Sequence, residues 1–180
     1  MVTAALPALA QTAPPGGYAL NRDHSKIGFS ISHFYVSSTE GQFTAFDGRL
    51  TFAPQAPEHG AVTIQISPGS ISTGNAARDE HLRTADFFDA AKFPSAVFES
   101  TSLVPVSGNA GTLTGSLSLH GVTRPITLHV TLQTPDVNAD RLNFSADGTL
   151  KRSDYGMNNY PGIIGDEVTL HIEAEFDRNR

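Results

Sequence analysis

No cysteine occurs in the 180 residues of this chain, and this absence excludes both disulfides and thiolate metal sites. Positive charge is also scarce, because 12 Lys and Arg stand against 18 Asp and Glu and give a net charge of −6. A chain without a basic surface is a poor match for a nucleic acid backbone, so we expect no nucleic acid partner. Long hydrophobic runs are missing too. Nothing in the sequence reaches the ~18 consecutive apolar residues that indicate a membrane-spanning helix.

The first 17 residues differ in character from the rest of the chain. They are mostly small and apolar, lack Lys and Arg, and contain Ala8-Leu9-Ala10, which fits the A-x-A pattern before a signal-peptidase cut. We interpret residues 1–17 as a leader, the remnant of a signal peptide, and expect an exported, periplasmic protein; a plain Ala/Pro leader is the alternative. Pro14-Pro15-Gly16-Gly17 separates this leader from a single domain expected over residues 18–180.

Apolar and polar residues alternate in eight later segments, which is the period of a strand with one buried face. In the first segment, Ile27, Phe29 and Ile31 share a face with His33. The other seven segments are 43–52, 62–66, 96–100, 113–119, 126–132, 142–146 and 168–176. A parity slip near Ala45 suggests a bulge. We expect an all-β fold class, an eight-stranded antiparallel up-and-down barrel, because closure removes exposed edges; a two-sheet sandwich is the alternative.

Reversals or kinks of the chain are expected at Gly108-Asn109, Pro135-Asp136 and Asp147-Gly148. An eight-stranded barrel is either filled by its own side chains or just wide enough for a small ligand. The inward positions mix small residues with large aromatics, which is compatible with either interior.

Residues 75–91 break the strand pattern, with Ala, Arg, Glu and Leu at the density of a helix. We expect a short helical insertion between the third and fourth strands. A solvated helix explains its charges, but not the adjacent Phe87 and Phe88. We therefore interpret the insertion as a lid or plug, with its aromatic side chains facing a cavity and its charges at the mouth.

Catalytic motifs are not evident. Asp23-His24-Ser25 contains the three residue types of a hydrolase triad, but neighbours on an extended chain point to opposite faces. No G-x-S-x-G, H-E-x-x-H, Walker or G-x-G-x-x-G motif occurs, and the histidines lack metal-ligand spacing. We expect a protein that is not an enzyme and has no metal or cofactor. The alternative is an enzyme acting on a lipid or quinone headgroup, with His81 and Asp79 or Asp86 as acid/base pair.

Six ordered motifs within residues 18–176 resemble those of the YceI-like family of polyisoprenoid-binding proteins. They are DHSKIGFSISH (23–33), EGQFTAFDGRL (40–50), a central block with SISTGN, RDEHLR, DFFD and KFPSAVFES (70–100), HGVTRPITL (120–128), RSDYGMN (152–158) and GDEVTLHIEAE (165–175). The resemblance implies a lipocalin-like periplasmic barrel that holds a long-chain isoprenoid lipid or quinone. It further implies a homodimer, a cytochrome b-type membrane partner and a role in stress response.

These observations together predict a non-catalytic carrier of an amphiphilic lipid; a filled barrel that binds a protein partner is a further alternative. The tail cavity is predicted to be lined by Phe29, Ile31, Phe43, Phe46, Phe98 and Leu117, and the headgroup end by Asn75, Arg78, His81, Asp86 and Tyr155. His33, Leu82, Phe87, Phe88 and Met157 complete the predicted ligand-binding set.

Overall fold

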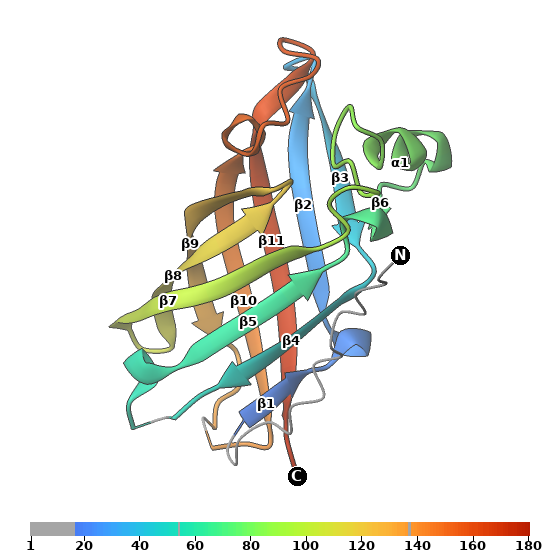
Figure 1. The fold of residues 1–180 in the computed structure, drawn as a ribbon. Coiled ribbons are helices and arrows are strands. Elements are labelled where there is room, and N and C mark those ends of the chain that lie inside the picture. The colour runs from blue at the N-terminus through green and yellow to red at the C-terminus, as the bar shows by residue number, and fades with distance from the viewer. Residues whose placement is uncertain (1–16, 54, 137) are drawn as a thin grey trace.

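The computed structural model describes residues 17–180 except residues 54 and 137 (Figure 1). The expected leader lies outside the described residues apart from Gly17, with which the first strand begins. Within this part of the chain no helix is long and apolar enough to cross a membrane.

Eleven strands, one α-helix and four 3-10 helices are found in the described residues. The strands are β1 (Gly17–Leu20), β2 (Lys26–His33), β3 (Ser37–Phe43), β4 (Phe46–Thr51), β5 (Ala61–Ile66), β6 (Ile71–Ser72), β7 (Ala96–Ser107), β8 (Ala110–Leu119), β9 (Val122–Leu132), β10 (Arg141–Lys151) and β11 (Ile164–Arg178). The helices are η1 (Arg22–His24), η2 (Pro57–His59), η3 (Pro68–Ser70), α1 (Ala76–Leu82) and η4 (Arg152–Tyr155).

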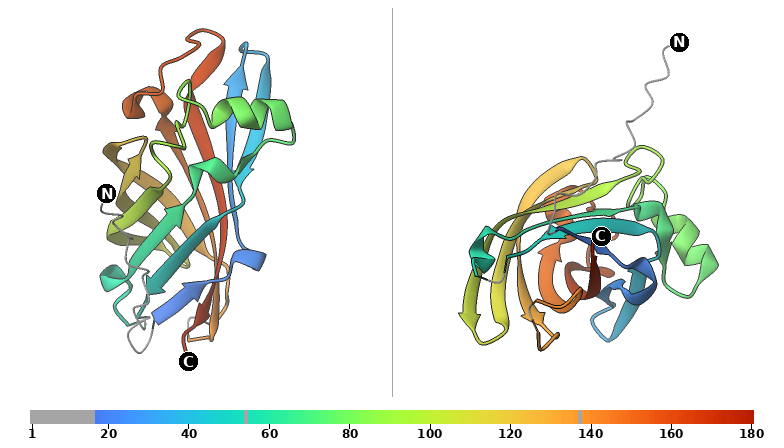
Figure 2. Two further views of the ribbon diagram at one scale, coloured as in Figure 1. Left: turned by 45° about the vertical axis from the view of Figure 1, so that its right-hand side comes forward. Right: turned by 90° about the horizontal axis from the view of Figure 1, so that it is seen from below.

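Eight of these strands close an antiparallel barrel in the order β1-β4-β5-β7-β8-β9-β10-β11, and β1 pairs back onto β11. Seen from below, the strands curve round a common interior (Figure 2). The predicted all-β barrel with one helical insertion is therefore confirmed. Strands β2, β3 and β6 form a branch, because β2 pairs with residues 164–173 of β11 while β1 pairs with residues 176–178.

Three details of the predicted strand pattern are wrong. Strands β1, β3 and β6 were not expected at all. The segment 43–52 is not one bulged strand, since β3 ends at Phe43 and β4 begins at Phe46. The parity slip marks a corner, where Ser70 Oγ accepts hydrogen bonds from the amides of Thr44 (3.1 Å) and Ala45 (2.9 Å).

The predicted reversals are right in two places and wrong in one. Gly108-Asn109 forms the β7–β8 turn, with a left-handed φ of 55° at Gly108, and residues 135–136 lie between β9 and β10. Asp147-Gly148, by contrast, lies inside β10. Gly148 is there because the Leu128 side chain fills the space: a Cβ would come 2.6 Å from Leu128 Cδ2.

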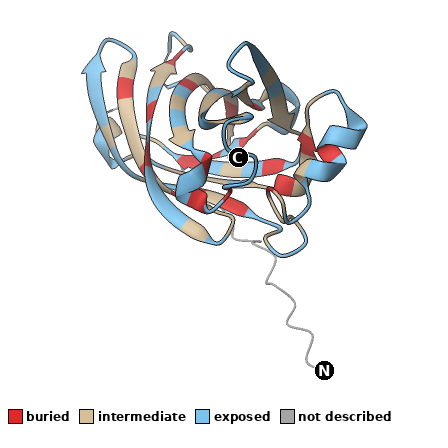
Figure 3. Cartoon of the chain, turned by 90° about the horizontal axis from the view of Figure 1, so that it is seen from above, coloured by how far each residue is buried: buried red, intermediate tan, exposed pale blue. Residues whose placement is uncertain are grey.

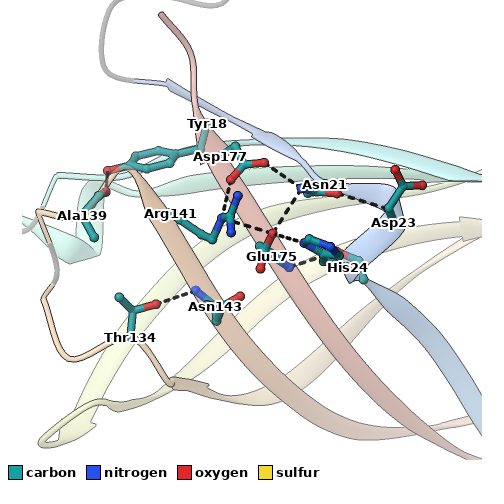
Figure 4. Close-up of polar contacts among 11 residues, drawn as sticks. Tyr18, Asn21, Asp23, His24, Thr134, Ala139, Arg141, Asn143, Glu175 and Asp177 are labelled. Carbon is teal, nitrogen blue, oxygen red and sulfur yellow. Dashed lines mark hydrogen bonds and ion pairs between the residues drawn. The ribbon is translucent and has the colours of Figure 1, made fainter.

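A polar cluster ties η1 to β10 and β11 at the end of the barrel where β1 joins β11 (Figure 4). His24 Nδ1 lies 2.7 Å from Glu175 Oε1, and Arg141 Nε donates to Asp177 Oδ1 at 2.8 Å. The hydrogen bond from Arg141 lowers the pKa of Asp177. Ser25 Oγ accepts from the Glu175 amide at 2.9 Å. His24 and Ser25 thus both bond to Glu175 of β11. These contacts attach η1 to the barrel and do not form a catalytic triad.

Buried side chains occur in two groups along the barrel. The group at the β1 end packs Tyr18, Leu20, Ile27, Phe46, Leu50, Leu132, Leu142 and Phe176 together. The second group contains Phe98, Leu117, Ile126, Leu128, Ala146, Tyr155 and Met157. Along the strands, buried and exposed residues alternate, as Figure 3 shows from above. The cavity reaches both groups, because Leu20, Leu50 and Phe176 of the first and Phe98 and Leu117 of the second line it.

Candidate functional site

A cavity of about 520 Å³ extends along the barrel interior between walls that are almost entirely apolar. Its volume falls within the ~300–1,000 Å³ of typical small-molecule sites. The interior is therefore hollow, whereas the alternative of a barrel filled by its own side chains predicted no internal cavity. Its inner wall includes Phe98, Leu117, Leu128, Ala146, Leu170 and Ile172.

Small residues and two glycines create this space. Ala96, Ser100 and Ala146 line the wall where larger side chains would fill it. Gly115 lets the Phe98 ring lie flat on the neighbouring strand, because a Cβ there would come 2.4 Å from the ring. Gly41 accommodates Phe29 in the same way, at 2.5 Å. The aromatic rings therefore lie along the wall instead of across the lumen.

The insertion is fastened to the preceding chain by its charged residues. Asp79 is buried, and its Oδ1 accepts hydrogen bonds from Thr73 N (2.9 Å) and Thr73 Oγ1 (2.6 Å). Arg78 Nε donates to Thr73 Oγ1 at 2.7 Å, and Arg83 Nε donates to Gly69 O at 2.7 Å. Asn75 caps helix α1 by accepting from Arg78 N at 3.0 Å. Asn75 and Asp79 thus have structural contacts that explain their presence.

The aromatic side chains of the insertion do face the cavity. Leu82, Phe87 and Phe88 all line it. Phe88 packs edge-on against Phe43 with ring centroids 5.7 Å apart, and Phe43 lies 5.7 Å from Phe29. An aromatic row thus runs from Phe88 of the insertion through Phe43 of β3 to Phe29 of β2, and all three rings line the cavity.

A cluster of His81, Asp86, Phe87 and Tyr160 joins the insertion to the loop before β11; we call it the latch. His81 Nε2 lies 2.8 Å from Asp86 Oδ2, and Tyr160 Oη donates to the same oxygen at 3.3 Å. The Phe87 and Tyr160 rings stack with centroids 5.6 Å apart. The hydrogen bond from His81 lowers the pKa of Asp86, so that carboxylate is ionised at neutral pH.

Arg152 holds the loop before β11 in place through hydrogen bonds to its backbone. Its side chain is buried and lines the cavity. Its guanidinium donates to four backbone carbonyls, those of Met157 (2.6 Å), Asn159 (2.8 Å), Gly165 (2.9 Å) and Ile164 (3.1 Å). Burial lowers the pKa of Arg152. This one side chain thus bonds to four carbonyls of the segment 157–165.

Tyr155 occupies a different place from the predicted one. It is fully buried in the second core group, and its hydroxyl has no hydrogen-bond partner among the described residues. Burial raises the pKa of Tyr155 to about 12. Its backbone carbonyl accepts a hydrogen bond from His120 Nδ1 at 2.8 Å. The residue therefore packs behind the cavity wall instead of reaching a ligand.

Replacing Tyr155 by Phe should leave the free energy of unfolding unchanged at neutral pH or raise it by about 1 kcal/mol, because an unpaired buried hydroxyl is removed. The pKa of the Tyr155 phenol is higher in the folded chain than its ordinary 10.0. The contribution of this group to the free energy of unfolding is therefore fully present below pH 10 and is lost as the pH rises toward 12. The variant should lack that part of the alkaline decline. Denaturant unfolding across pH 8–12, approximately, with exposed Tyr35→Phe as control, measures both effects. A loss above about 1 kcal/mol at neutral pH would show that the hydroxyl has a partner.

Most of the predicted binding residues meet at the cavity. Those that line it are Phe29, Ile31, His33, Phe43, Arg78, His81, Leu82, Phe87, Phe88, Phe98, Leu117 and Met157. Four do not. Phe46 faces the core group at the β1 end, Asn75 caps α1, Asp86 lies behind His81 in the latch, and Tyr155 packs outside the wall.

Sequence reasoning missed other residues of the wall. Arg152, Tyr160 and Ile163 line the cavity from the loop before β11 and from η4. No period-two pattern covers this stretch, so alternation could not find them. Leu128 and Leu170 were recognisable as inward positions of their strands, and the alternation there was signal enough.

Comparison with known proteins places these features in a context. The YceI-like domain family matches residues 18–176. The protein YceI of Salmonella newport (strain SL254) is 39% identical over 155 residues, covering 84% of this chain and 81% of the relative. Among solved structures, BcnA of Burkholderia cenocepacia is similar with a TM-score of 0.81 at 25% identity, covering 87% of this chain and 98% of that one.

A further solved structure has the same fold. It is a polyisoprenoid binding domain from Saccharophagus degradans, implicated in plant cell wall breakdown. Its TM-score is 0.72 at 19% identity, over 90% of this chain and 98% of that one. At this identity the likeness concerns the architecture alone.

Proposed function

This chain belongs to the YceI-like domain family, and we propose that it is a non-catalytic carrier that holds one long-chain isoprenoid lipid or quinone inside its barrel. The observation that carries the proposal is the cavity of about 520 Å³ with its apolar wall. The structural neighbour from Saccharophagus degradans, a polyisoprenoid binding domain, supports the same ligand class.

Apolar burial supplies the binding free energy in this proposal. At ~0.8 kcal/mol per buried CH₂, about twelve chain carbons give roughly 10 kcal/mol before ordering costs are subtracted. No particular chain length is selected, because an apolar wall distinguishes one methylene by only ~1–3 kcal/mol.

Polar groups at one end orient the ligand. His33, Arg78, His81 and Tyr160 all line the cavity near the insertion and the loop before β11. The His33 ring and the Arg78 guanidinium offer hydrogen-bond donors to a quinone carbonyl or a phosphate, while the tail lies among Phe98, Leu117 and Leu128. A few convergent polar groups in an apolar pocket are the usual way in which orientation is fixed.

The contacts within the latch favour a structural role for His81 and Asp86 over a catalytic one. Asp79 accepts hydrogen bonds from Thr73, and the carboxylate that contacts His81 is that of Asp86. His81 does contact Asp86, but that carboxylate also accepts from Tyr160 and thereby holds two segments together. We propose that the His81–Asp86 pair fixes the insertion. A periplasmic location, a homodimer and a cytochrome b-type partner stay predictions of the family resemblance.

Loading with a defined prenyl quinone tests this function. The chain is stripped of bound lipid with organic solvent, refolded, incubated with the quinone, and separated from free ligand by gel filtration. Native mass spectrometry should then find one quinone per barrel. A chain that recovers its β-sheet circular dichroism but retains no prenyl quinone or prenyl phosphate would overturn the carrier function.

A further inference from the structure

Large apolar side chains are exposed at one end of the molecule, in the β2–β3 turn and in the loop before β11. The exposed fractions are 56% for Phe34, 83% for Tyr35, 89% for Val36, 39% for Tyr160 and 40% for Ile163. We call these five residues the rim. Exposed apolar patches of this kind mark interaction sites on otherwise polar surfaces.

The two halves of the rim are joined into one structure. Phe34 N donates to Ile163 O at 2.8 Å, and His33 pairs with Ile164 across β2 and β11. The turn and the loop accordingly lie side by side at the top of Figure 1. Phe34 and Tyr35 both adopt left-handed φ angles, 53° and 60°, which bulky residues rarely adopt. The backbone therefore holds two aromatic residues outward at a tip where glycine or asparagine would be easier to place.

The rim continues into the cavity. Tyr160 and Ile163 belong both to the exposed rim and to the cavity lining, and His33 lines the cavity directly behind Phe34. An apolar surface thus extends from solvent at Val36 to the lumen. A ligand leaving the barrel at this end would meet the rim first.

Charge is absent from the two segments that carry the rim. Residues 34–39 and 155–165 contain no Asp, Glu, Lys or Arg, although the chain as a whole has a net charge of −6. An uncharged tip with tyrosines and aliphatic residues matches the interfacial layer of a bilayer, where tyrosine is enriched. It does not match an acidic or basic protein surface, because it offers no complementary charge.

We propose that the rim docks on the surface of a lipid bilayer, so that the isoprenoid passes between the bilayer and the cavity without crossing water. This inference rests on the proposed carrier function. Phe34, Tyr35 and Val36 enter the interfacial layer, and the part of the cavity that Tyr160 and Ile163 line then faces the lipid. Docking of this kind is shallow and reversible, because few side chains are buried.

Transfer from vesicles tests the proposal with a matched pair of double variants. Tyr35→Asn/Val36→Ser removes two rim side chains and keeps a residue type that tolerates a left-handed φ. Val104→Ser/Val106→Ser removes two exposed valines, 57% and 68% exposed, from β7, away from the rim (Figure 1). Each protein receives prenyl quinone by two routes, from phosphatidylcholine vesicles and from ethanol solution.

The rim variant should take up quinone from vesicles about tenfold more slowly than wild type, because losing two apolar side chains lowers the affinity for the vesicle surface by about that factor. Its capacity from ethanol should be unchanged, and the β7 variant should match wild type by both routes. Equal vesicle rates for rim variant and wild type would overturn the docking proposal and leave the carrier function intact. Failure of every protein to hold quinone from ethanol would overturn the carrier function itself. A wild type that is dimeric only through the rim would also overturn bilayer docking, because the surface would be covered by a second copy.

Discussion

Replacing Ala146 by Trp should abolish retention of prenyl quinone while the barrel stays folded. Ala146 lies in the middle of β10, pairs with Val130 and Ile172, and lines the cavity. An indole at this position extends into the empty lumen and occupies space that the ligand chain needs. Because the side chain fills a void, it adds apolar contacts without forcing the strands apart. We expect at least a hundredfold loss of affinity, or about 2.7 kcal/mol.

His129→Trp is the matched control for this substitution. His129 is exposed on the outer face of β9, where it pairs with Asp147 next to Ala146. The same side chain is therefore introduced at the same level of the barrel, but outside it. Binding measured by native mass spectrometry should be unchanged. If Ala146→Trp bound quinone as tightly as His129→Trp, the ligand would have to lie outside the lumen.

Replacing Arg152 by Ala should lower the free energy of unfolding by about 3 kcal/mol or more. Four backbone carbonyls accept hydrogen bonds from this buried guanidinium, and each costs ~1–3 kcal/mol if it is left buried without a donor. Partial opening of residues 157–165 to water limits the loss. That opening should also weaken quinone retention, since the same loop lines the cavity.

Arg141→Ala provides the contrast in a stability measurement. Arg141 has two carboxylate partners, Glu175 and Asp177, yet its side chain is 54% exposed. Pairs of that kind contribute about 1 kcal/mol or less. In urea unfolding, Arg152→Ala should therefore lose far more free energy of unfolding than Arg141→Ala. The reverse order would show that the carbonyl cage around Arg152 is not what stabilises the loop.

Alternation of apolar residues was enough to predict the barrel wall, because inward and outward positions differ most where one face meets the lumen. Strand β3 could not be found in this way. Its residues 37–42 are polar or glycine, and Gly41 is needed where the Phe29 ring lies across the strand. Strand β1 has only four residues and is fixed by its pairing with β4 and β11, which no local pattern indicates.

The candidate site could be predicted only where strands and the insertion supply it. Phe87 and Phe88 were identified because two adjacent phenylalanines are out of place on a solvated helix, and both line the cavity. Tyr155 and Arg152 illustrate the limit. They are three residues apart in one motif, but the arginine reaches the lumen and the tyrosine packs behind the wall. The turn of η4 decides between them, and neither residue type reveals that orientation.

The position of the ligand's tail tests most directly whether the barrel interior is the binding site. A crystal structure of the chain loaded with a prenyl quinone brominated at its far end would locate that end by anomalous scattering. We predict a bromine peak inside the barrel, among Phe98, Leu117 and Leu128, with the quinone ring toward His81 and Tyr160. A stoichiometric complex whose bromine lies on the outer face of the strands would contradict the account.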